Sequence, residues 1–482
     1  MLLSCRHVSI PLGLVLAALM AGCSHSYSVM LTASGEPLVD RFPEFKAAAT
    51  ESRIAEAAGL NLRVRFPANA EFAADEALDL VRSVAEFLQR ETGATASGLV
   101  TVYLAHVPRG GEPPYAAARG PGAYTEILYA QPGAKLLEVD WNRDRFFGSF
   151  IHELAHLYLR GLPSMDRWLE DGLPEYLSAK FVHLHSEAAY LARVNWQPPL
   201  VALDSSSLVP WSYEDFERFQ KEFPSDPELA YLVLWDNAHR YAAAGALVRR
   251  WMEAAEAKGI AAPVEDLLVR VRRLEGPVTL NDLETLVRQQ TGQSLDDLAR
   301  VSAEERAAEA ERASRYLRAS DPQVQIYALR TVEAFGLPAD TVPGDLLEAV
   351  ASRQDEYPNQ SLYLAAGRAI ASTGDKPTAR RLVDLVRDRF PGDRARRYLP
   401  PQIWEALLPV NREEAFAELV AAVNDTGLSL PVRRDANESL ERATGKSVGW
   451  DERQTAAVRA RAAARWAEIA SVSNNRTGEP DR

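Results

Sequence analysis

The chain has 482 residues, of which 25% are charged and 47% are hydrophobic, as is usual for a folded globular protein of several domains. The formal net charge of −13 argues against nucleic acid and against an anionic membrane surface as binding partners. The sequence contains 2 cysteines, so neither a disulfide-rich fold nor a cysteine-based zinc site is expected.

Residues 1–22 have the features of an export signal, with a positive charge before the short apolar segment 10–21. This segment ends in Leu-Met-Ala-Gly-Cys, which resembles the lipobox of bacterial lipoproteins and implies that Cys23 carries a lipid. In that family, the following Ser24 implies sorting to the outer membrane. We therefore expect a tether at residues 23–50 and a protein of the bacterial cell envelope, facing the periplasm and held at the membrane only by its lipid anchor. An ordinary signal peptide that happens to end in Gly-Cys is the alternative.

The segment that follows mixes predicted helices and strands. An alanine-rich stretch predicts a short helix at 47–59, and alternating apolar residues predict a strand at 60–66. We further predict a helix at 74–92, strands at 99–104, 127–130 and 135–141, and a Gly- and Pro-rich loop at 107–124.

The sequence His152-Glu-Leu-Ala-His156 carries the functional prediction. On a helix, two histidines four residues apart leave the same face, one turn above the other. Glu153 lies next to the first histidine and can reach a water bound between them. Two neutral nitrogen ligands and a carboxylate that accepts a proton from water are what a zinc-dependent hydrolase needs. The alternative is a helix whose histidines are ordinary core or surface residues.

A catalytic zinc ion also needs a third protein ligand, and three acids follow the motif: Glu170, Asp171 and Glu175. They lie in the segment Trp-Leu-Glu-Asp-Gly-Leu-Pro-Glu-Tyr at 168–176. This segment resembles the gluzincin-type, peptidase-MA-like metallopeptidases, in which His-Glu-x-x-His is followed by Trp-Leu-x-Glu-Gly-Leu-Ala-Glu-Tyr and the first glutamate of that segment binds the metal. Matching by position places the ligand at Asp171, and Pro174 replaces the usual alanine.

The aspartate is one methylene shorter than the family's glutamate, so the choice of ligand stays open. We predict Asp171 as the ligand and Glu175 as the partner of a ligating histidine. Glu175 or Glu170 could instead bind the metal. The alternative is that these acids bind no metal and only stabilise the N-terminus of a helix, where negative charge is favourable.

The resemblance implies an α+β zincin-like metallopeptidase domain over residues 51–300. In that family an edge strand of the sheet binds the substrate peptide, and residues 127–130 are our candidate for it. A helix predicted at 230–252 would pack behind the site, as in related proteins, some of which use a tyrosine or histidine from it to stabilise the oxyanion. Tyr231 is the candidate catalytic residue, with His239 second, although both could be ordinary core or surface residues.

From residue 303 the pattern is helical, and strand signals vanish. Helix pairs that recur roughly every 40–50 residues suit a HEAT-like helical-repeat domain, which we place at 303–470 before a disordered tail at 471–482. A plain helical bundle is the alternative. The helices are predicted at 321–335, 362–370, 382–390, 416–423 and 432–440.

These features together predict a zinc metallopeptidase. His152, His156 and Asp171 would hold one Zn²⁺ ion, and Glu153 would act as the general base on a peptide or protein substrate. The repeats would bind the substrate or a partner protein. Two alternatives are an inactive relative that keeps zinc as a binding scaffold, and a periplasmic scaffold in which the repeats alone are functional.

Overall fold

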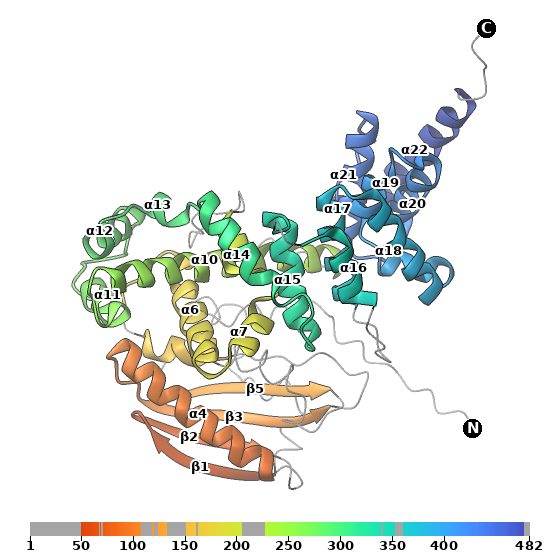
Figure 1. Ribbon diagram of the computed structural model, residues 1–482. Helices are drawn as coiled ribbons and strands as arrows, with labels where there is room; N and C mark the ends of the chain where they lie inside the picture. Colours follow the sequence, from red (N-terminus) through yellow and green to blue (C-terminus); the bar gives the residue numbers. More distant parts are fainter. Residues whose placement is uncertain are drawn as a thin grey trace, which may run out of the picture. The chain divides into compact units, whose positions relative to one another are not determined.

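The computed structural model describes residues 50–66, 68, 71–107, 118–119, 124–132, 151–160, 162–204, 227–338, 341–351 and 360–476. The expected signal peptide, Cys23 and the tether up to residue 49 lie outside these residues, as does the strand predicted at 135–141. The described chain forms two compact units (Figure 1). The first contains most of the residues up to Val301, and the second contains the residues from Ser302 onward. Described residues 195–201 and 227–235 belong to the second unit. Across the described ranges, no helix is long and apolar enough to cross a membrane.

The first unit begins with a β-hairpin. Strand β1 (Glu51–Ala57) pairs antiparallel with β2 (Leu60–Phe66), and the turn residues Ala58 and Gly59 have φ angles of 51° and 84°. Positive φ at both turn residues is typical of the two-residue turn that matches the twist of paired strands. The helix predicted at 47–59 is therefore wrong over residues 51–57. Pairing with β2 outweighs the helix propensity of the alanines.

The sheet has the strand order β1-β2-β3-β5-β4, where β3 is Gly98–Val107, β5 is Tyr124–Pro132 and β4 is Ala118–Arg119. Strands β2, β3 and β5 are parallel, and β1 and β4 are antiparallel to their neighbours. The strands predicted at 60–66 and 99–104 are confirmed. The edge predicted at residues 127–130 is wrong at Ile127, which pairs with Val102 on one side and Ala118 on the other. The described part of β4 pairs only with Glu126 and Ile127, so the edge role of residues 128–130 stays a prediction.

Helix α4 (Glu71–Thr92) lies along the sheet and contacts β1 and β2 (Figure 1). It buries one stripe of apolar side chains, including Val81 and Leu88, as the sequence predicted. Gly93, with a φ of 60°, follows its last residue. Phe87 packs edge-to-face against Phe181 of α6, with ring centroids 5.1 Å apart. The core of this unit therefore extends from the sheet through α4 to the helices that carry the candidate site.

One of these helices is α6 (Arg167–His185). Helix α10 (Pro227–Ala257) confirms the helix predicted at 230–252. Residues 236–257 of α10 belong to the first unit. The other helices of this part of the chain are α7 (Glu187–Val194), α8 (Pro199–Asp204), α11 (Pro263–Val271), α12 (Leu280–Thr291) and α13 (Leu295–Ala299).

The regular elements described in the second unit are all helices. Within it α15, α17, α19 and α21 each contact the next of the four, and the intervening helices pack against them. Helix α22 runs to Arg476, which corrects the disordered tail predicted from residue 471; residues 477–482 lie outside the described chain. Its helices are α14 (Ala303–Ser314), α15 (Pro322–Phe335), α16 (Pro343–Ala351), α17 (Gln360–Thr373), α18 (Lys376–Arg389), the 3₁₀ helix η2 (Gly392–Arg397), α19 (Pro401–Leu407), α20 (Arg412–Asn424), α21 (Leu430–Thr444) and α22 (Ala456–Arg476).

Candidate metal centre

The two histidines of the motif lie on helical residues 151–158, which are all buried. His152 and His156 are 5% and 7% exposed, and their Nε2 atoms are 3.2 Å apart. The apolar side chains of Ile151 and Leu154 on the same helix are fully buried. Helical spacing therefore places both imidazoles together inside the first unit, as the sequence pattern indicates.

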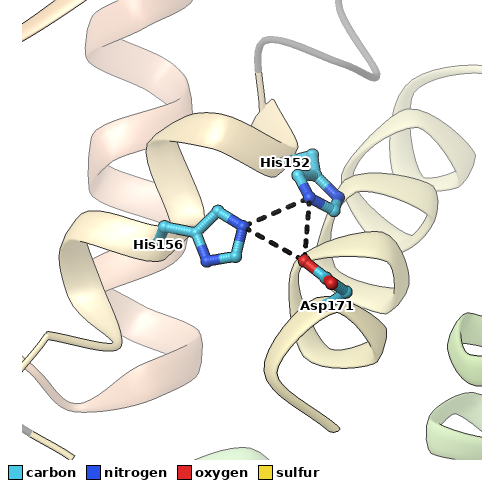
Figure 2. Close-up of side chains that lie close together, drawn as sticks. All are labelled: His152, His156 and Asp171. Atoms are coloured by element: carbon cyan, nitrogen blue, oxygen red, sulfur yellow. Dashed lines mark hydrogen bonds and ion pairs between the residues drawn. The ribbon is translucent and has the colours of Figure 1, made fainter. Parts of the chain in front are cut away.

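Helix α6 adds one carboxylate oxygen to these two nitrogens (Figure 2). Oδ1 of the fully buried Asp171 lies 3.8 Å from Nε2 of His152 and 3.7 Å from Nε2 of His156. The nearest point equidistant from the three atoms is about 2.1 Å from each, a length within the range of bonds from metal ions to nitrogen and oxygen ligands. His152, His156 and Asp171 thus form a buried group that could hold a metal ion.

Glu175 lies on the other side of His152. Its Oε1 is 3.1 Å from Nδ1 of His152, and its Oε2 accepts a hydrogen bond of 2.7 Å from Arg193. Burial alone would raise the pKa of Glu175, but the charge of Arg193 and the contact with His152 lower it to about 2. Glu175 is therefore an ionised partner for the nitrogen that faces away from the three-atom group, an arrangement common around metal-binding histidines.

Arg167, the first residue of α6, holds the second oxygen of Asp171. Its Nε lies 2.9 Å from Oδ2 of Asp171, and its Nη1 lies 3.1 Å from Oε2 of Glu170. Both the arginine and Asp171 have fully buried side chains. Glu170, one of the alternative ligands, is thus engaged by the arginine and is not part of the three-atom group.

Glu153 is a buried carboxylate beside these groups. It is 6% exposed, and its Oε2 has no hydrogen-bond partner among the described residues. Burial, together with the negative charges of Asp171 and Glu175, raises the pKa of Glu153 well above its usual range, although Arg167 opposes the shift. A cation bound nearby would favour the charged form of Glu153, so this buried oxygen suits a site that carries a positive ion.

His156 has the protonation state that metal binding requires. Burial, followed by the positive charges of His152, Arg167 and Arg160, lowers the pKa of His156 well below its usual range. Its imidazole is therefore neutral at pH 7, which leaves a nitrogen lone pair for an ion.

Two glycines bring α6 and α10 close together at the site. A Cβ added to Gly172 would lie 2.9 Å from the backbone oxygen of Ala244, and a Cβ added to Gly245 would lie 2.8 Å from Cβ of Glu175. Real Cβ atoms do not approach other heavy atoms this closely. The absence of a side chain at these positions therefore allows the close approach of the two helices that holds Glu175 against α10.

The candidate oxyanion donors lie on α10. Tyr231 lies within α10, but its side chain is outside the described part of the structure. His239 is half-buried. Tyr241, ten residues after Tyr231, has its ring centroid 6.2 Å from that of His152. Among the described side chains of α10, Tyr241 therefore places an aromatic ring next to a candidate ligand.

The sequence reasoning missed Arg167, Arg193 and Tyr241. Arg167 had a usable signal, because it precedes Glu170 by three residues and Asp171 by four, which places all three on one face of a helix. Arg193 is eighteen residues from Glu175 on a different helix, so no local pattern connects the two.

The chain matches no protein-family model, and a search of curated proteins finds no match to it.

Proposed function

We propose that this protein is a zinc-dependent metallopeptidase whose metal site consists of His152, His156 and Asp171. The observation that supports this most strongly is the convergence of two Nε2 atoms and one carboxylate oxygen, 3.2 to 3.8 Å apart and buried beside an unpartnered carboxylate oxygen of Glu153. Two imidazoles and one carboxylate are a ligand set of catalytic zinc, and they leave one position for water.

The same ligand set also suits a second metal. Two histidines and one carboxylate can hold Fe²⁺ as well as Zn²⁺. Metal analysis of the purified protein therefore decides between the two ions.

Each residue has a role in amide hydrolysis. When bound, zinc would acidify a water molecule and polarise the carbonyl group of the substrate. Glu153 accepts the proton of the attacking water and passes it to the leaving amine. The carboxylate of Glu175, 3.1 Å from Nδ1 of His152, favours the tautomer that carries its proton on Nδ1 and leaves Nε2 free to bind a metal. Tyr241, whose ring centroid lies 6.2 Å from that of His152, joins Tyr231 as a candidate donor to the oxyanion.

The other parts of the chain have proposed roles as well. The first unit would be a zincin-like domain of the gluzincin type, and the helical pairs of the second unit would form HEAT-like repeats that bind the substrate or a partner protein. The lipobox-like sequence before Cys23 supports a lipid-anchored protein of the cell envelope that works on peptides at the periplasmic face.

The test uses the purified full chain. Zinc content is measured by inductively coupled plasma mass spectrometry, and a peptide library is digested with the wild type, Glu153→Gln and the control Glu304→Gln, which changes an exposed glutamate of α14. One zinc ion per chain, with cleavage that is lost in Glu153→Gln and kept in Glu304→Gln, would support the proposal. Zinc without cleavage would favour a zinc-binding scaffold, and absence of zinc at micromolar concentrations would refute the proposal.

A further inference from the structure

Arg167 occupies a position that local helix chemistry does not favour. It is the first residue of α6, where the partial positive charge of the helix terminus disfavours a cation. Its side chain is also fully buried, and burying a guanidinium group is costly unless it is paired. Among the described residues, its partners are the carboxylates of Asp171 and Glu170.

The two carboxylate oxygens of Asp171 have different neighbours, because one contacts Arg167 and the other faces the two histidines. Oδ2 is 2.9 Å from Nε of the arginine, whereas Oδ1 lies 3.7 and 3.8 Å from the two histidine Nε2 atoms. The guanidinium group is planar and rigid, and while its Nε forms this ion pair with Asp171, its Nη1 lies 3.1 Å from Oε2 of Glu170. Two carboxylates therefore hold the arginine, and the arginine in turn limits rotation of the Asp171 carboxylate.

We propose that Arg167 is a positioning residue, which fixes the carboxylate of Asp171 so that Oδ1 alone serves the metal. This inference rests on the proposed metal site. The side chain of Asp171 is short, and it is attached to a helix whose depth is set by the contact of Gly172 with α10. The arginine on the preceding turn keeps the short ligand extended toward the histidines and prevents Oδ2 from competing for the ion.

A positioning role and a purely electrostatic role predict opposite changes in metal affinity. Removing a positive charge close to a divalent cation relieves repulsion, so an electrostatic effect alone would tighten metal binding. Loss of a group that orients a ligand weakens metal binding, typically by 10- to 100-fold. The sign of the change therefore distinguishes the two roles.

The chain offers a matched control in Arg270 of α11. Its Nε lies 2.6 Å from Oδ2 of Asp266, so it is also an arginine paired through Nε with an aspartate four residues away on its own helix. Its side chain is 35% exposed, and neither partner belongs to the metal-binding group. Arg270→Met removes the same kind of ion pair without changing the site.

The experiment compares the full-length wild type with Arg167→Met, Arg167→Lys and Arg270→Met. Zinc affinity is measured by competition with a chromophoric chelator, and the visible spectrum of bound Co²⁺ reports on coordination number. Circular dichroism of the metal-free proteins checks folding. We expect at least tenfold weaker zinc binding in Arg167→Met, together with weaker Co²⁺ bands as coordination departs from tetrahedral. Arg167→Lys keeps the charge but loses the planar donor group, so we expect an intermediate loss, whereas Arg270→Met should match the wild type.

Equal or tighter zinc binding by folded Arg167→Met, with an unchanged Co²⁺ spectrum, would overturn the positioning role. Should that variant fail to fold, Arg167→Lys decides: wild-type affinity and spectrum in the lysine variant would overturn the proposal as well. If the wild type binds zinc and cleaves peptides in a Glu153-dependent manner, these results refute the role of Arg167 and leave the proposed function intact. A wild type that binds no zinc would refute both.

Discussion

The close packing of α6 against α10 predicts that a single added methyl group will disturb the metal site. In Gly245→Ala the new Cβ would lie 2.8 Å from Cβ of Glu175, whereas carbon atoms in contact are normally about 3.5 to 4.0 Å apart. One of the two groups must therefore move by about 1 Å. Either the two helices separate, or the side chain of Glu175 shifts away.

Both responses have measurable consequences. Overpacking of a well-packed contact costs about 1–3 kcal/mol, and the higher helix propensity of alanine returns about 1 kcal/mol. We therefore expect a net destabilisation of about 0–2 kcal/mol. A shift of about 1 Å would also lengthen the 3.1 Å contact between Glu175 and Nδ1 of His152 beyond hydrogen-bonding distance. Losing this partner of a ligating histidine should weaken zinc binding about 10- to 100-fold.

The assay is zinc affinity by chelator competition, combined with thermal unfolding of the metal-free protein followed by circular dichroism. Gly344→Ala in α16 is the control, because a Cβ there would meet no atom within 4 Å. This control should bind zinc like the wild type and should be no less stable. Wild-type zinc affinity together with an unchanged or higher unfolding temperature in Gly245→Ala would refute the argument from close packing.

Four further predictions concern the metal ligands, Glu175, Tyr241 and the packing of the second unit. Asp171→Ala should abolish stoichiometric zinc binding, whereas Glu175→Ala should only weaken zinc binding, because Glu175 contacts Nδ1 of His152 and is not part of the three-atom group. Plasma mass spectrometry of both variants tests this prediction. The reverse result would make Glu175 the ligand. Because the pKa of Glu175 is lowered from 4.5 to about 2, the stability that it contributes is present above pH 4.5 and is lost as the pH falls toward 2. The loss is at most roughly 3 kcal/mol, so acid unfolding of the metal-free wild type followed by circular dichroism should be steeper in this range than that of Glu175→Gln, and identical profiles would contradict the prediction. Tyr241→Phe should lower kcat about 100-fold or more with zinc content unchanged if its hydroxyl stabilises the oxyanion, and steady-state kinetics with unchanged kcat would remove this role. Gly367→Ala places a Cβ 2.4 Å from Cδ of Pro400, so denaturant unfolding should show a loss of about 1–3 kcal/mol in the second unit, and an unchanged midpoint would show that α17 and α19 can separate freely.

Sequence reasoning succeeded where the physical constraint is local. The spacing of His152 and His156 places both side chains on one face of any helix, and the alternation at residues 60–66 fits a strand with one buried side. It failed at residues 51–57, where alanine indicated a helix but the hairpin turn at Ala58 and Gly59 allows pairing with β2. Helix propensity contributes a few tenths of a kcal/mol per residue, so strand pairing and burial readily outweigh it.

By itself the sequence determined that two imidazoles share a helix face next to a glutamate, and that one of three nearby acids could complete a metal site. Only the tertiary structure decided which acid faces them, because that depends on how α6 packs against the motif helix and α10. It placed Oδ1 of Asp171 toward both Nε2 atoms, Glu175 against Nδ1 of His152, and an arginine on the remaining oxygen of each carboxylate. Periodicity in a sequence records which residues share a face, whereas the distance between two helices is set by side chains that meet from different parts of the chain.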